Sequence, residues 1–147
     1  MTAIPDTPRP TPRRTALSHT FRLDPDLRSV AIARRHVSAV VAEWGTAIDV
    51  DTAILLTSEL VANAVIHASV PGEPVWLAII CCGDHLRVEV HDPAGHDVEC
   101  KCLTMDGESG RGLAIVAALA DYWGWEPTAW GKNVYFHLSA ATAAQAA

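Results

Sequence analysis

The sequence lacks an apolar run long enough to cross a bilayer. The longest such run is Val75–Cys82, VWLAIICC, whereas a membrane-spanning helix needs about 20 apolar residues. Arg13 and Arg14 are not followed by a hydrophobic segment, so they do not form a twin-arginine export signal. The sequence therefore predicts a cytoplasmic protein with no membrane partner.

Basic residues are scarce after residue 35. That part of the chain has four basic residues against fourteen acidic ones, and the whole chain carries a net charge of −6. Nucleic-acid-binding proteins rely on Lys and Arg to neutralise phosphates. The acidic body therefore predicts no direct nucleic-acid partner. Residues 1–35 hold seven arginines; this basic N-terminus could touch a polyanion, but a solvated arm is the expected interpretation.

The 147 residues lack an internal repeat, and half of them are hydrophobic. Such a chain predicts one globular domain. Residues 1–18 contain four prolines among Thr, Ser and Arg, which predicts a flexible tail. Residues 19–139 are expected to form the domain, and the Ala-rich residues 140–147 a short second tail.

The pattern of apolar residues predicts helices in the first half and mainly strands in the second. A helix is expected at Pro25–Trp44, capped by Asp24 and closed by Gly45, and another from Asp49 or Asp51 to about Ala68. Short turns between the strands favour a two-layer α+β sandwich, with a mixed, mostly antiparallel sheet and the helices on one face. The expected strands are His19–Leu23, Val75–Cys82, Leu86–His91, Tyr122–Glu126 and Asn133–Leu138, and a third helix is expected at Leu113–Ala120.

The second helix, LLTSELVANAVIHA, carries two polar residues on an apolar flank. Glu59 and Asn63 lie one turn apart, and Leu55, Leu56 and Ile66 are expected to face the core beside them. Burying a carboxylate or an amide without a partner costs several kcal/mol. A bound ligand or metal would offset that cost. The alternative is that both side chains bond a neighbouring loop or lie at the rim of the stripe.

Two further features complete a candidate nucleotide site. Asp92 ends a strand at a turn, where its carboxylate can accept a hydrogen bond from an exocyclic amine. After a long loop, Gly110, Arg111 and Gly112 open a helix, whose N-terminus attracts anions. An asparagine oxygen suits Mg²⁺, and a carboxylate one turn away can take a proton from an attacking hydroxyl.

ELVANAVIHA resembles the N box of the GHKL, or Bergerat-fold, ATP-binding domains, and the layout of residues 20–138 resembles the bacterial anti-sigma-factor serine kinases. The resemblance implies ATP and Mg²⁺ as cofactors, with Glu59 as catalytic base and Asn63 as the Mg²⁺ ligand. Asp92 would read adenine, with Gly95 in the same box. Gly110, Arg111 and Gly112 would lie beside the phosphates, and the residues between Asp92 and Gly110 would form the ATP lid.

The resemblance implies a serine/threonine kinase that phosphorylates an anti-sigma-factor antagonist and sequesters a sigma factor, with a homodimer left open. One departure supports an alternative. Ala94 and His96 stand where the family's box after Asp92 has glycines, and a Cβ restricts close ligand approach. A non-catalytic or degenerate partner-binding module therefore stays open.

Two other groups of residues are given simpler interpretations. Cys81, Cys82, Cys100 and Cys102 could form a zinc site with nearby histidines, but their spacing is not that of common zinc motifs. They are expected to be reduced strand and loop thiols. Lys132 is expected either to reach a phosphate or to be an ordinary surface lysine.

Overall fold

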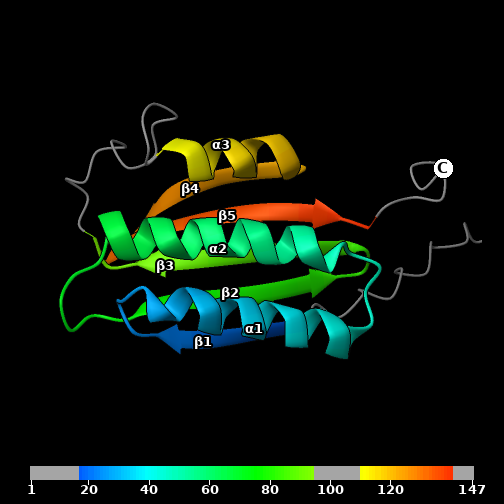
Figure 1. Cartoon of the computed structure of the whole chain (residues 1–147), viewed down its shortest axis with the longest axis horizontal. Coiled ribbons are helices and arrows are strands. Elements are labelled where there is room, and N and C mark those ends of the chain that lie inside the picture. Colours follow the sequence, from blue (N-terminus) through cyan, green and yellow to red (C-terminus); the bar gives the residue numbers. More distant parts are fainter. Residues whose placement is uncertain (1–16, 95–109, 141–147) are drawn as a thin grey trace, which may run out of the picture.

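The computed structural model describes residues 17–94 and 110–140. Within these ranges, five strands form one sheet in the order β1-β2-β3-β5-β4, and every neighbouring pair is antiparallel (Figure 1). The expected α+β fold is confirmed, although the described strands are wholly antiparallel rather than mixed. In chain order the elements are β1 (Leu17–Leu23), α1 (Arg28–Trp44), α2 (Val50–His67), β2 (Val75–Cys82), β3 (His85–Asp92), α3 (Gly110–Leu119), β4 (Tyr122–Thr128) and β5 (Gly131–Ser139).

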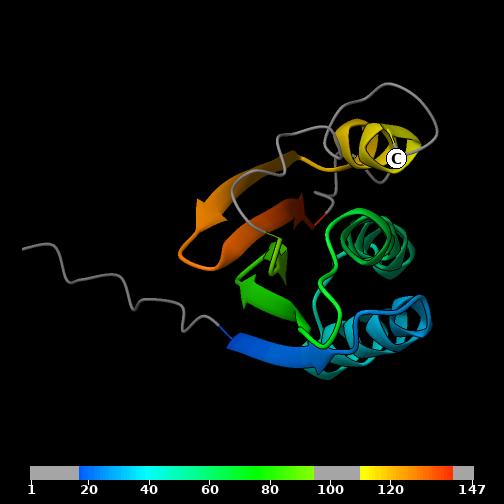
Figure 2. The ribbon, with the colours of Figure 1, turned by 90° about the vertical axis from the view of Figure 1, so that its left-hand side faces the viewer.

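All three helices cover the same face of the sheet. Figure 2 shows α1, α2 and α3 on one side and the strands on the other. The core lies between these layers, where Leu56 and Leu60 of α2 join Leu77, Val88 and Phe136 of the strands in one buried cluster. Alternate strand residues face the helices. Near the strand ends, side chains on this face can contribute to a site between the sheet and the helices.

The first helix begins three residues later than expected. Asp24 does not cap it with its side chain; instead, the Asp24 carbonyl accepts a hydrogen bond from Ser29 Oγ. Asp26 accepts from the Arg28 backbone N–H at 2.8 Å, so residues 24–27 form a turn that precedes α1. Gly45 ends the helix with φ at +60°, as predicted, because glycine adopts this left-handed conformation readily.

Asp49 caps the N-terminus of α2, where its carboxylate accepts from the backbone of Asp51 and Thr52. The expected core stripe was partly wrong. Leu56 is buried, but Leu55 is 40% and Ile66 59% exposed. The helix is apolar on most sides, and the face that meets the sheet carries Ala53, Leu56, Leu60, Val61 and Ala64.

By length and composition alone, α2 would pass as a membrane-spanning helix. Core helices of soluble proteins pass the same test. Here α2 packs against α1, α3, β3 and β5, and eight of its residues are buried. Its apolar composition therefore matches its place at the centre of the helix layer.

The edge strand β1 is held to α1 by stacked rings. Phe21 and His36 have ring centroids 3.7 Å apart, and His19 stacks on Trp44 at 5.5 Å. Burial, together with the nearby charge of Arg35, lowers the pKa of His36 below its ordinary value of 6.5. The neutral ring is therefore the form that packs at this edge.

We expect acidification to weaken this packing. Because the folded-state pKa of His36 is lowered, its contribution to stability is present above about pH 6.5 and is lost as the pH falls. His36→Phe keeps a stacking ring that cannot charge. The melting temperature of the variant should fall less between pH 7.5 and 5.5 than that of the wild type. Equal falls in the two proteins would contradict this role of His36.

Candidate functional site

Four pieces of the chain meet at one end of the domain. The C-terminal half of α2, the end of β3, the first turn of α3 and the start of β5 all lie on the left of Figure 1. Helix α2 packs against each of the other three. The fold therefore brings together the segments that carry Glu59, Asn63, Asp92 and Gly112, which lie far apart in sequence.

Glu59 lies against the first turn of α3. A Cβ built on Gly112 would be 2.5 Å from Glu59 Oε2, so any larger residue there would require this carboxylate to shift. The N-terminus of α3 carries the positive end of the helix dipole and free backbone N–H groups. A carboxylate and an anion-binding helix end are thus adjacent, which is an arrangement suited to moving a proton beside a phosphate.

Asn63 is 9% exposed, one turn further along α2. Its side chain makes no hydrogen bond within the described ranges. Its amide atoms are not among the fully buried polar atoms that lack a partner, so water or a ligand can reach them. The alternative considered for this residue, a hydrogen bond to a neighbouring loop, is not found in the described part of the chain.

Asp92 is 1% exposed at the end of β3. Its Oδ1 accepts hydrogen bonds from the Ala94 backbone N–H at 3.1 Å and from Lys132 Nζ at 3.2 Å. Lys132 Nζ also lies 3.1 Å from Oδ2, but that contact is an ion pair without hydrogen-bond geometry. Oδ2 is left buried with no hydrogen-bond donor among the described residues.

Burial raises the pKa of the Asp92 carboxyl above its ordinary value, while the charge and hydrogen bond of Lys132 act in the opposite direction. The backbone N–H of Ala94 and the charge of His91 also favour the ionised form. Neighbouring groups therefore stabilise the charged form of Asp92 against the effect of burial, and Lys132 makes the largest of these contributions.

Gly131 closes the site from β5. A Cβ at this position would overlap the carbonyl oxygen of Asp92 and touch Pro93. The two backbones can approach this closely only because residue 131 has no side chain. The turn after Asp92 is consequently pressed against the start of β5, which orients the Asp92 side chain.

Several predicted residues lie outside this geometry. Gly95, His96 and the predicted lid fall outside the described residues, as do Cys100 and Cys102. Gly110 and Arg111 are placed in the first turn of α3, but their side-chain surroundings are not described. Within residues 17–94 and 110–140, no three His, Cys, Asp or Glu side chains form a metal-binding group.

The interpretation of Lys132 as a surface lysine was wrong. Its side chain is 5% exposed and faces the helix layer, in line with the buried Val134 and Phe136 of β5. The period-two alternation of that strand, extended back by two residues, would have placed Lys132 inside. Gly131 was not predicted from the sequence, because the need for glycine at this position comes from the close packing of another strand, β3.

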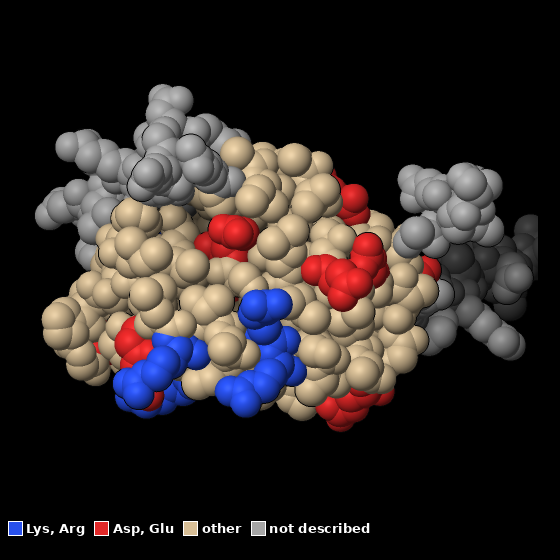
Figure 3. All heavy atoms as spheres, viewed as in Figure 1, with Lys and Arg blue, Asp and Glu red and all other residues tan. Residues whose placement is uncertain are grey.

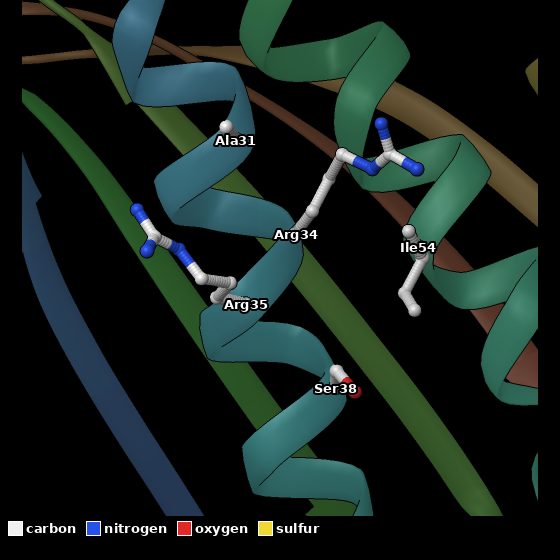
Figure 4. Close-up of a pocket in the computed structure, with 5 residues that line it drawn as sticks. All are labelled: Ala31, Arg34, Arg35, Ser38 and Ile54. Atoms are coloured by element: carbon white, nitrogen blue, oxygen red, sulfur yellow. The ribbon is translucent and has the colours of Figure 1, made fainter.

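A separate pocket of about 350 Å³ lies between α1 and α2, lined by Ala31, Arg34, Arg35, Ser38 and Ile54. Figure 4 shows Arg34 reaching toward α2 and Arg35 on the opposite side of α1. On the helix-covered face of the molecule, basic side chains gather over α1, whereas acidic side chains are spread across the whole face (Figure 3). None of the predicted site residues lines this pocket.

Residues 23–137 match the family model of the histidine kinase-like ATPase domain. The chain belongs to this family. The match runs from the end of β1 to near the end of β5, and family membership assigns ATP binding to the domain. A search of curated proteins finds no match. The GHKL resemblance seen in the sequence is thereby confirmed at the level of the domain.

Proposed function

We propose that the protein is an ATP-dependent serine/threonine kinase that regulates transcription by acting on an anti-sigma-factor antagonist and sequestering a sigma factor. The observation that carries the nucleotide part is the buried Oδ2 of Asp92, an acceptor that lacks a donor within the described residues. The 6-amino group of adenine is a donor of the right kind. The partners follow from the resemblance of residues 20–138 alone.

The residues present suit Mg²⁺ and ATP. Asn63, which is 9% exposed, offers an amide oxygen, a hard ligand of the type that Mg²⁺ accepts alongside water and phosphate oxygens. The glycines at 110 and 112 open the N-terminus of α3 to the phosphates. When bound, Mg·ATP supplies the phosphoryl group and the metal neutralises charge on its oxygens.

Glu59 is proposed to orient the serine hydroxyl of the substrate and to take its proton. Its carboxylate already lies against the helix end proposed to bind phosphate. A module that only binds a partner has no use for a carboxylate in this place. The chemistry would therefore be general-base assistance to phosphoryl transfer.

A non-catalytic module is the second candidate, and Ala94 favours it. Ala94 is buried two residues after Asp92, where the resemblance expects glycine, and its N–H already donates a hydrogen bond to Asp92. Such a protein would hold its partner with nucleotide as a structural switch or without any nucleotide. Transfer of labelled γ-phosphate to a serine of the antagonist decides between the two, since the module transfers none.

Asn63→Ala is expected to abolish most of the Mg²⁺ dependence of ATP binding, because it removes the proposed ligand oxygen. Calorimetry with and without Mg²⁺ measures the effect, and circular dichroism checks that the variant stays folded. Asn63→Asp keeps an oxygen ligand and should retain the Mg²⁺ dependence. An unchanged Mg²⁺ dependence in Asn63→Ala would remove Asn63 from the metal site.

A further inference from the structure

Lys132 is a buried cation with spare hydrogen-bonding capacity. Its ammonium group has three N–H donors, and one of them is used on Asp92 Oδ1. No other hydrogen bond of Lys132 is found within the described ranges. Burying a lysine is costly unless it is paired, so its place opposite Asp92 in the β3–β5 register calls for a specific role.

The two oxygens of Asp92 are made unequal by their neighbours. Oδ1 receives two donors, from Ala94 and Lys132, and a carboxylate oxygen has about two lone-pair positions. Oδ2 receives none. The carboxylate therefore presents one filled oxygen and one open oxygen, both buried.

We propose that Lys132 is a positioning residue for the purine base: it fills Oδ1 of Asp92 and leaves Oδ2 as the single acceptor for the 6-amino group of adenine. This inference rests on the proposed role of Asp92. It differs from the phosphate contact considered for Lys132, because Nζ contacts Asp92, whereas the helix end suited to phosphate lies beside Glu59.

The charge of Lys132 also favours the ionised form of Asp92, in which both carboxylate oxygens are acceptors. Burial raises the pKa of Asp92 and favours the protonated carboxyl, which would offer an O–H instead of an open acceptor. The groups that oppose this effect are Lys132, the Ala94 N–H and, more weakly, His91. Without Lys132, the pKa of Asp92 would rise further, and the carboxylate would lose the partner that orients it.

The test compares Lys132→Met with the wild type on three ligands by calorimetry. The ligands are ATP, adenosine, and the triphosphate of purine riboside, whose base lacks the 6-amino group. The variant should bind ATP and adenosine more weakly by the same factor, roughly tenfold. It should bind the purine riboside triphosphate as the wild type does. Arg34→Met, which removes one charge from the pocket on α1, is the matched control and should change none of the three.

Three results would overturn the inference. A loss with ATP but not with adenosine would assign Lys132 to the phosphates. An equal loss with all three ligands would mean a general structural role. No loss at all would leave Lys132 without a part in binding. If the wild type binds neither ATP nor adenosine, the proposed function fails, and the carboxyl titration described next decides on Lys132.

The Asp92 carboxyl carbon, followed by NMR without nucleotide, should titrate at higher pH in Lys132→Met than in the wild type. Equal titration would overturn the inference. If Lys132→Met does not fold, Asp92→Asn and the double variant Asp92→Asn/Lys132→Met replace it. Because the Asp92→Asn substitution leaves Lys132 no carboxylate to position, the double variant should bind ATP as Asp92→Asn does. A further loss in the double variant would contradict the proposal.

Discussion

Glu59→Gln is expected to leave ATP affinity nearly unchanged while phosphoryl transfer falls by about 10²–10⁴-fold, the usual contribution of a general base. The substitution keeps the shape of a side chain that lies against Gly112. It removes the negative charge that would take the proton of the attacking hydroxyl. Affinity and transfer should therefore separate in this one variant.

The measurement is transfer of labelled γ-phosphate to the antagonist protein, with calorimetry of ATP on the same samples. Glu73→Gln is the matched control, because Glu73 is exposed in the loop after α2 and should have no effect. A Glu59→Gln variant that transfers phosphate at the wild-type rate would exclude Glu59 as the base. Absence of transfer from the wild type with any such antagonist would leave the binding module.

Gly131→Ala is expected to lower the free energy of unfolding by about 1–3 kcal/mol, as overpacking in a tight interior does, and to weaken ATP binding. The added methyl group would overlap the backbone carbonyl of Asp92, which cannot turn away as a side chain can. Relief of the overlap requires β3 and β5 to separate at their paired ends. That movement would displace Asp92 from Lys132.

Gly124→Ala provides the control within a strand of the same sheet. Its Cβ would meet the hydroxyl of Tyr135 at 2.8 Å, the far end of a side chain that can move. Urea denaturation should therefore show a larger loss for Gly131→Ala than for Gly124→Ala. Equal losses would show that the close approach to Asp92 is not a special constraint.

The sequence predicted well those elements whose limits are set locally. The bounds of β2 were predicted without error, because an apolar run ends at Gly83, which adopts φ of +62° in the turn. The start of α2 was predicted at Asp49 or Asp51, and side-chain capping selects Asp49. The start of α1 was missed because two aspartates compete there, and the hydrogen bonds of Asp26 hold residues 24–27 in a turn.

The site was predictable in its motifs but not in its contacts. Glu59 and Gly112 carry separate patterns, and nothing in either pattern states that they touch. Leu55 and Ile66 were assigned to the core because α2 is apolar on most sides, and only its packing between α1 and α3 selects the inner face. Lys132 was misjudged because its charge suggested the surface, whereas its partner lies 40 residues away in sequence.

The 40 residues that separate Asp92 from Lys132 in sequence affect the order in which the site can assemble. Asp92 precedes α3 and β4, and its cation arrives only with β5, which inserts between β3 and β4. Closing so long a loop carries an entropic cost that local helix formation does not. A chain emerging from the ribosome would display Glu59, Asn63 and Asp92 well before Lys132, and the part of the candidate site around Asp92 would be completed last. Conversely, any transient release of the β4–β5 hairpin would open that part first, so bound nucleotide and the final strand would hold each other in place.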